Sequence, residues 1–487
     1  MMEVPADRFF GISSAPNHTS ETQLEGWQQV IHEFYDLYND TVLDAPMRAR
    51  LAEFAAKIKG MHTDHAEDQK KLARLVQHWK KLSERELRGE LLMLSTLPEE
   101  LLPILVEEAL QKVADAGGTN AWAMLSEKEK ADREAVVYQK ICFRFGQAAY
   151  DAMTEKEKNE VDFFIWAGCC MHKELNSVKG GNASLMAFWE KAGIQGPMPL
   201  MNRDNAAASA LGSSAAKSRA ENITQAGGVK ITSLAGALFN HKDDKKGHHD
   251  IFGDFFESKL GYPIAFPDTS NTRYQTYCLG AGCLILYLPY FIEFLEQVRD
   301  KKDGGLFNHM EQNVFRALHD VPTITELCVL TLYSQIISAP YMRSVRGPSH
   351  DTTNLLDLGP LHDKVREHCQ NVINNPDLVL AADASYELGA LDGNVWDQPD
   401  IFYAVKRMAN GLPHLREALV VFLRGSLSTW VRFSAEFAPG GAIANATPQE
   451  CQAAFMRCTN DKNEGALGSF RVNARLRPRM SLQQHNS

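Results

Sequence analysis

The stretch that decides the fold runs from Gly60 to Leu72 and reads GMHTDHAEDQKKL. A short apolar segment around Ile58 leads into it and is typical of a strand, whereas most residues after Asp64 are polar or charged. Apolar side chains then recur at helical spacing, at Leu72, Leu75, Val76 and Trp79. The pattern predicts that Asp64 stands where a strand gives way to a helix.

Asp64 has two interpretations at such a junction. Aspartate before a helix is a good N-cap, because its carboxylate accepts hydrogen bonds from the first helical amides. Alternatively, the acid points from the end of the strand into a crevice, with its backbone fixed on both sides. Spacing alone favours the cap.

Composition limits the classes of function. The chain has 487 residues, more than one domain usually holds. Its formal net charge of −10 does not indicate nucleic-acid binding, so a DNA-binding role would have to rest on local basic patches. Nine cysteines are scattered along the chain, and this odd number suits a reducing compartment better than a disulfide framework.

Two apolar segments, Cys278–Phe294 and Ile324–Ile337, are candidates for membrane spans. Each is short or is interrupted, by Pro289 or by Glu326, whereas a span needs about 18 or more unbroken apolar residues. We therefore predict two buried helices and no membrane partner. The first residues, Met1–Pro5, lack the basic region and apolar run of a signal peptide.

The N-terminal third alternates between strand and helix patterns. We predict a buried strand at Arg8–Ser14, an amphipathic helix that starts near Thr19, and helices over residues 66–160. The run Val161–Gly168 is nearly all apolar and predicts another buried strand. Four Ser/Thr–Glu pairs fit the capping box that opens a helix. They are Ser83/Glu86, Thr96/Glu99, Ser126/Glu129 and Thr154/Glu157.

The middle of the chain changes composition. Residues 203–228 are rich in Ala, Ser, Asn and Gly, which predicts a flexible linker over 201–235. The segment His241–Asp250 (HKDDKKGHHD) could bind a metal, but it lacks the HExxH spacing, and a solvated charged loop is favoured. Thr447-Pro448-Gln449-Glu450 is a strong helix start. A basic tail follows it, with Arg471, Arg475, Arg477 and Arg479.

Four motifs occur in order along the chain: TDHAEDQKK at 63–71, CCMHKELN at 169–176, NTRYQTY at 271–277 and TNDKNEGALGSFR at 459–471. Together they resemble the transposases of hAT-like DNA transposons, a class with an RNase H-like core and a DDE metal site. The resemblance rests on the order of the motifs and on the helical stretch that separates them. It runs from about residue 9 to residue 475.

Single residues carry this resemblance. Asp64 fits the second catalytic aspartate, which ends the fourth core strand in a TDxAxNMxxA-like pattern. His172 fits the histidine of a CxxH motif followed by LN. Tyr274 takes the place of Trp in a TRW-like motif, here with Arg273 before it, that opens a long helical insertion. Glu464 matches the catalytic glutamate on a late helix.

The resemblance implies a helix-dominated α/β fold: an incomplete RNase H-like core interrupted by a large all-helical insertion domain. We expect the first part of the core over 1–200, the linker over 201–235, the insertion over 236–440, and the last core helix with the basic tail over 441–487. DNA, in the form of transposon ends, is the expected partner and the nucleus the expected location. Any homo-oligomer is expected to form through the insertion domain.

The same resemblance implies the chemistry of DNA strand cleavage and transfer. Asp64 and Glu464 are expected to bind Mg²⁺ or Mn²⁺, since a pair of ions about 3.5–4 Å apart activates the attacking oxygen and stabilises the leaving one. His172 is expected to act beside them. The expected DNA contacts are Arg273, Tyr274, Arg471 and Arg475, which would neutralise phosphates.

One part of the family pattern is missing. The first catalytic aspartate belongs to the first core strand, but Arg8–Ser14 matches the third strand and leaves nothing upstream for the first two. Asp7 is an early acid, but its position is wrong for this role. Without a central strand, backbone groups at the edges of the sheet would lack partners. We therefore expect a truncated transposase without strand-transfer activity.

Two other interpretations stay open. The chain could be a transposon-derived protein that binds DNA or other proteins without catalysis, or a helical scaffold with no nucleic-acid partner. Convergence of Asp64 and Glu464 near a third acid would favour the enzyme. A DNA affinity that does not change with salt would favour the scaffold.

Overall fold

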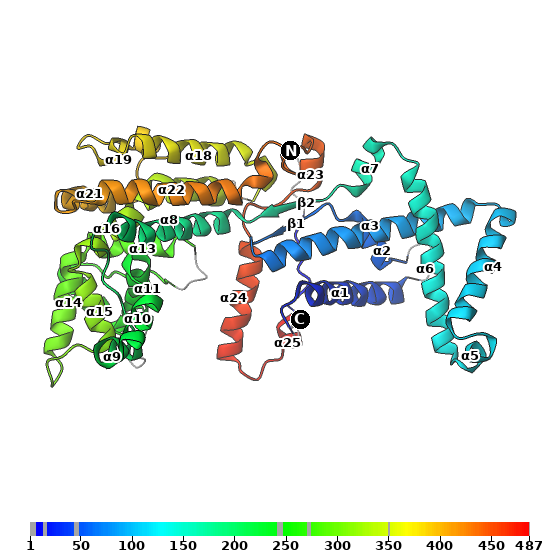
Figure 1. The fold of residues 1–487 in the computed structure, drawn as a ribbon, viewed down its shortest axis with the longest axis horizontal. Helices are drawn as coiled ribbons and strands as arrows, with labels where there is room; N and C mark the ends of the chain where they lie inside the picture. The colour runs from blue at the N-terminus through cyan, green and yellow to red at the C-terminus, as the bar shows by residue number, and fades with distance from the viewer. Residues whose placement is uncertain are drawn as a thin grey trace. The chain divides into compact units, whose positions relative to one another are not determined.

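The computed structural model describes residues 6–12, 17–42, 48–240, 247–269, 274–348 and 351–486. The chain divides into two compact units (Figure 1). The first contains Met1–Gly168, Asn445–Met456 and Asn460–Ser487, and the second contains Cys169–Ala444 and Arg457–Thr459. Both units are built mainly of helices, which confirms the helix-dominated part of the predicted fold class.

Figure 1 labels most of the helices and both strands. Those of the first unit are α1 (Ser20–Thr41), α2 (Leu51–Lys57), β1 (Gly60–Thr63), α3 (Glu67–Ser95), α4 (Pro98–Asp115), α5 (Thr119–Met124), α6 (Glu127–Asp151), α7 (Glu155–Asp162), β2 (Ile165–Gly168), α23 (Pro448–Ala453), α24 (Asp461–Leu476) and α25 (Leu482–Asn486). Those of the second unit are α8 (Cys170–Ala192), α9 (Arg203–Leu211), α10 (Ser214–Ile223), α11 (Gly227–Phe239), α12 (His249–Leu260), α13 (Thr276–Leu286), α14 (Leu288–Asp300), α15 (His309–Ala317), α16 (Val321–Tyr333), η3 (Ser334–Ser338), α17 (Ala339–Arg346), η4 (Leu355–Asp357), α18 (Gly359–Asn374), α19 (Asp377–Leu380), α20 (Tyr386–Gly389), α21 (Pro399–Met408), η5 (Ala409–Gly411), α22 (Leu415–Phe433) and η6 (Ala435–Phe437).

β1 and β2 form a two-stranded parallel sheet in which Gly60 lies opposite Ile165 and Thr63 lies opposite Gly168. The prediction of a strand before Asp64 is confirmed, and the strand predicted at 161–168 is confirmed in its second half. The sheet packs on α3, since Met61 joins a core cluster with Leu72, Ala73 and Val76. The junction between β1 and α3 is therefore held by apolar packing on one side of the sheet.

The strand predicted at Arg8–Ser14 is wrong for the residues that the structure describes. Residues 6–12 have no regular structure, and Phe10 is 47% exposed. The ring of Phe10 packs edge-on against Phe34 of α1, with 5.5 Å between ring centroids. An apolar run becomes a strand only where a neighbouring strand pairs with it, and here these apolar side chains pack on a helix instead.

Helices α3 and α6 cross at two glycines. A Cβ at Gly89 of α3 would lie 1.6 Å from the carbonyl oxygen of Cys142, and a Cβ at Gly146 of α6 would lie 1.7 Å from that of Arg85. No side chain fits at either position, because the two backbones themselves are in contact. A small buried cluster also joins these two helices, and it consists of Met93, Ile141 and Cys142.

Three of the helix starts read from the sequence are confirmed as capping boxes: Ser126/Glu129, Thr154/Glu157 and Thr447/Glu450. Two others are wrong. Ser83 lies inside the long helix α3, and α4 has Leu97 at its N-cap with no side-chain capping bond. The Thr96 hydroxyl instead donates a 2.8 Å hydrogen bond back to Leu92 of the preceding helix, so it ends α3 rather than starting α4.

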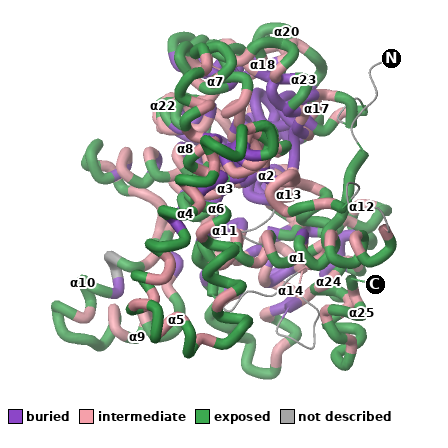
Figure 2. Tube along the Cα trace, turned by 90° about the vertical axis from the view of Figure 1, so that its right-hand side faces the viewer, coloured by how far each residue is buried: buried purple, intermediate pink, exposed green. Residues whose placement is uncertain are grey.

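The linker predicted over 201–235 is helical. It holds α9, α10 and most of α11, and exposed residues run along α9 and α10 (Figure 2). α9 has no buried residue, whereas Ile231 of α11 is fully buried. Alanine is small but is also the best helix former, so a stretch rich in Ala forms helices even with little to bury. The compact units also divide differently from the predicted domains, because the second unit begins at Cys169.

The two apolar segments are core helices of the second unit, as predicted. Val321–Arg346 is long and apolar enough to cross a membrane, but 89% of its most apolar window is buried inside the protein. The other segment breaks into α13 and α14, which meet at a bend of 82°. Such burial is typical of the central helix of a globular unit.

All nine cysteines lie in the described part of the chain, and all are free thiols. Eight are buried and Cys283 is half-buried. Burial raises the pKa of several of them, to about 12 for Cys283 and Cys369, because a thiolate is poorly solvated there.

Candidate functional site

Asp64 stands directly after β1, and its carboxylate shapes the chain there. Its Oδ1 accepts a 2.9 Å hydrogen bond from the backbone N–H of Ala66. This is an Asx turn, in which the carboxylate of one residue accepts a hydrogen bond from the backbone N–H two residues later. The N-cap of α3 is Ala66, which makes no side-chain capping bond, so the interpretation of Asp64 as the cap is wrong. Asp64 instead fixes the turn that precedes the helix.

His65 closes the carboxyl end of the sheet beside Asp64. It is buried, and its ring meets that of Trp166 edge-on with 5.5 Å between centroids. A Cβ at Gly168, the last residue of β2, would lie 2.1 Å from His65 Nε2, so glycine is needed there. The Trp166 indole N–H donates a 2.9 Å hydrogen bond to Thr63 Oγ1. Sequence reasoning missed His65, whose signal was its place next to Asp64.

Glu464 lies in the first turn of α24, on a helix that buries none of its residues. Its side chain is exposed, and Oε1 accepts a 3.3 Å hydrogen bond from the amide of Asn460. Asp64 and Glu464 belong to the same compact unit. A carboxylate in the first turn is favourably placed against the positive end of the helix dipole, which is the ordinary structural role of such a residue.

The expected Mg²⁺ or Mn²⁺ site at Asp64 and Glu464 stays a prediction. Mg²⁺ prefers carboxylate oxygens, which Asp64 and Glu464 both offer. However, no three His, Cys, Asp or Glu side chains come together as a metal-ligand group within the ranges that the structure describes. Most of the charged segment His241–Asp250 lies outside these ranges, and of its described residues His248 pairs with Glu311 at 2.9 Å. We therefore derive no chemical step through a metal ion.

The second and third motifs meet in the second unit, although they are 102 residues apart. His172 lies near the start of α8, and the Tyr274 hydroxyl lies 3.1 Å from its Nε2 and 3.2 Å from its Nδ1. The two rings meet edge-on with 5.0 Å between centroids. Asn176 donates a 2.8 Å hydrogen bond to the carbonyl of His172. The predicted DNA contact Arg273 lies outside the described residues.

Beside this pair lies a buried carboxyl group that sequence reasoning missed. Glu174 of α8 is fully buried, and Ser338 donates a 2.6 Å hydrogen bond to its Oε1. Burial raises the pKa of Glu174 to about 7, and hydrogen bonds from Ser338 and from the backbone of Gln275 oppose the rise. Spacing could have flagged Glu174, because a glutamate that falls among apolar positions of a helix marks a buried acid.

The predicted DNA-contacting arginines lie on the surface of the first unit. Arg471 and Arg475 are exposed residues of α24, and Arg477 and Arg479 are exposed in the segment after it. Among the described residues, none of these four guanidinium groups makes an ion pair. Arg471 and Arg475 are four residues apart and so share one face of the helix.

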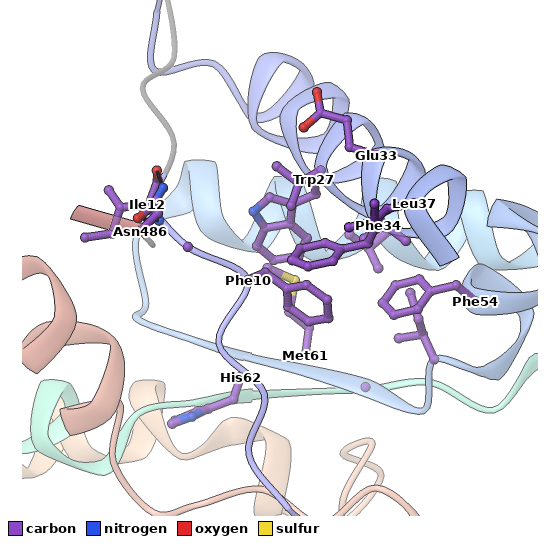
Figure 3. A pocket seen from close by; sticks show the side chains of 16 residues that line it. Phe10, Ile12, Trp27, Glu33, Phe34, Leu37, Phe54, Met61, His62 and Asn486 are labelled. Atoms are coloured by element: carbon purple, nitrogen blue, oxygen red, sulfur yellow. Dashed lines mark hydrogen bonds between the residues drawn. The ribbon is translucent and has the colours of Figure 1, made fainter. Parts of the chain in front are cut away.

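The first unit also has an apolar cleft of about 640 Å³. Figure 3 shows Phe10, Trp27 and Phe34 gathered over Met61 of β1, with Glu33 at the rim. Trp27 and Phe34 are 42% and 47% exposed, which is high for side chains of this size. These exposed rings make one contiguous apolar patch.

The chain matches no family model, no curated protein and no solved structure. Its function must therefore be inferred from its own residues.

Proposed function

We propose that this chain is a DNA-binding protein related to the hAT-like transposases whose motifs it resembles. The supporting observation is the exposed basic surface formed by Arg471 and Arg475 of α24 and Arg477 and Arg479 after it, which we call the arginine face. No acidic residue occurs between Gly465 and Asn486 to offset it.

Local charge makes this binding reasonable in an acidic protein. The net charge of −10 repels DNA at long range, but screening at physiological salt limits such repulsion to about 8 Å. A phosphate at the arginine face would be attracted by its four guanidinium groups. The spacing of Arg471 and Arg475, about one helical turn or 6 Å, suits two neighbouring phosphates of one strand.

The parallel pairing of β1 and β2 supports the family relation in a second way. In the family the second catalytic aspartate ends the fourth core strand, and the CxxH motif comes at the end of the fifth. Here Asp64 follows β1, and β2 ends two residues before Cys170, the first residue of α8. We take this pair as the remnant of an incomplete RNase H-like core. A nuclear location and self-association through the helical second unit belong to the same proposal.

The test is DNA binding by the full chain, measured by fluorescence anisotropy across a salt series. Each phosphate contact contributes about 0.9 to the slope of log K against log salt, so Arg471→Ala with Arg475→Ala should lower the slope by about 1.8. The control is Arg424→Ala with Arg432→Ala, which removes two exposed arginines of α22 and should leave the slope unchanged. A wild-type affinity that does not respond to salt would refute the proposal.

A second candidate function is metal-dependent DNA strand cleavage, with Asp64 and Glu464 as ligands of Mg²⁺ or Mn²⁺ and His172 beside them. It is favoured by the place of Asp64 at the carboxyl end of a parallel strand, where such sheets form their crevices. We expect binding without strand transfer. If the chain nicks end-labelled DNA, and if this activity disappears in Asp64→Asn and in Glu464→Gln, strand cleavage becomes the favoured function.

A further inference from the structure

We propose that the carboxyl group of Glu174 is a proton-operated latch: it holds the start of helix α13 closed when protonated and releases it when ionised. The proposal does not depend on DNA binding, and its test uses no DNA. It rests on three features of the second unit, which are a chain of hydrogen bonds, an uncompensated buried acid and a strained residue at the helix start.

The latch is a short chain of hydrogen bonds that links three elements. The side-chain amide of Gln275, the residue before α13, donates a 3.2 Å hydrogen bond to Ser338 Oγ. Ser338 in turn donates to Oε1 of Glu174 on α8 at 2.6 Å. Ser338 is the last residue of the π-helix η3, a rare element that is frequent at functional sites. The backbone of Gln275 also donates a hydrogen bond to Glu174. The start of α13 is therefore tied to α8 both directly and through the Ser338 hydroxyl.

Among the residues that the structure describes, no cationic side chain pairs with Glu174. Its Oε2 makes no hydrogen bond to any residue that the structure describes. The titratable groups that face it are the thiol of Cys278 on α13 and the phenol of Tyr333 on α16, neither of which is cationic. On α8 itself, Lys173 is directed to Glu436 and to the carbonyl of Phe433. An ionised Glu174 would thus be a buried charge without compensation.

Backbone strain at Gln275 makes the start of α13 the segment that opens when the hydrogen bonds are lost. Gln275 has φ of 60°, and among the described residues it is the one non-glycine residue with positive φ. Such a conformation persists only where surrounding contacts hold it. Loss of the contacts to Ser338 and Glu174 would let Gln275 relax, and water would then reach the carboxylate.

The direction of the pH effect follows from linkage. The pKa of Glu174 is about 7 in the closed state, against an ordinary value of 4.5 that it would regain on hydration. Between these values the closed state holds a proton that the open state has lost. The open fraction should therefore rise about tenfold per pH unit from about 4.5 to about 7, and should level off above that.

The experiment is hydrogen exchange of the full chain between pH 5 and pH 8, corrected for intrinsic exchange rates. The amide of Leu279, which donates to the carbonyl of Gln275 at 2.9 Å, should lose protection by about tenfold per pH unit up to pH 7, and Glu174→Gln should abolish this dependence. Ser338→Ala removes a bond that lowers the pKa of Glu174, so the plateau should move to higher pH.

Glu326 supplies the matched control. Its pKa is also raised to about 7 by burial, but both of its oxygens are bonded, to the Trp189 indole at 2.7 Å and to the Gly228 amide of α11 at 2.8 Å. Glu326→Gln should leave the pH dependence of α13 unchanged. Protection of α13 that is constant with pH in the wild type, or a slope that survives in Glu174→Gln, would overturn the proposal. If Glu174→Gln does not fold, the wild-type and Ser338→Ala curves decide it.

Discussion

At the scale of single residues, buried ionisable groups set the response of the second unit to acid. His362 is fully buried between Tyr341, whose hydroxyl lies 3.2 Å from Nε2, and the carbonyl of Leu358, 2.7 Å from Nδ1. Burial, together with the nearby charge of Lys173, lowers its pKa to about 3. The imidazole is therefore neutral in the folded protein at pH values where it is charged in the unfolded chain.

We predict that His362 makes the second unit acid-labile. Between the ordinary pKa of 6.5 and the lowered one of about 3, the unfolded state binds one more proton, so stability falls as pH falls. The unfolding free energy should drop by about 1.4 kcal/mol per pH unit below 6.5 through this residue. Denaturation of His362→Gln between pH 4 and pH 7 should show the slope reduced by that amount. The exposed His319→Gln is the control, and an equal change there would contradict the assignment.

Some residue roles could be read from the sequence and others could not. The position of Asp64 at a strand–helix junction is confirmed, because periodicity changes there. The meeting of His172 with Tyr274, and the burial of Glu174, depend on how helices far apart in the sequence pack together. Periodicity along one helix carries no information about such partners.

At the scale of elements, close helix packing depends on glycine in the first unit. We predict that Gly89→Ala costs about 3 kcal/mol or more in unfolding free energy, since the added methyl group would meet a backbone oxygen rather than a flexible side chain. Gly465→Ala on α24 is the matched control. Nothing lies within 4 Å of a Cβ there, so it should stabilise the helix by up to about 1 kcal/mol. Urea denaturation measures both, and an equal effect of the two would contradict the crossing.

Predictions of single elements succeed where the interactions that form the element are local in sequence, and fail where they depend on distant segments. Thr447 with Glu450 was predictable because a capping box is completed within four residues. The pair Ser83/Glu86 has the same kind of sequence pattern, but α3 continues past it as one helix that packs on α6. The predicted strand at Arg8–Ser14 fails for a similar reason, since pairing depends on a partner strand that local sequence does not reveal.

At the scale of the whole molecule, we predict that the two compact units unfold in separate transitions. Gly89→Ala should lower the transition of the first unit alone. Trp430→Ala, which empties a fully buried site of α22, should lower that of the second alone, by about 3–5 kcal/mol. Calorimetry of the wild type and both variants is the measurement. One transition that moves as a whole in both variants would contradict the division.

The division into units was beyond sequence reasoning for a physical reason. The expected boundary near residue 200 was placed where composition turns polar and small. The observed one, at Gly168, falls between a strand and a helix with no change in composition. α8 belongs to the second unit because it packs along α22, and that contact joins segments more than 200 residues apart.

The shielded thiols described above have a practical consequence for a chemist who handles this protein. Cys142 and Cys451 belong to the first unit and the other seven cysteines to the second. Alkylating reagents attack thiolates, so in the intact protein they should react slowly at the eight sites without solvent access. A label on any of the eight buried cysteines thus reports, by mass, which of the two units had unfolded. The native chain carries its own set of probes, with no engineering needed.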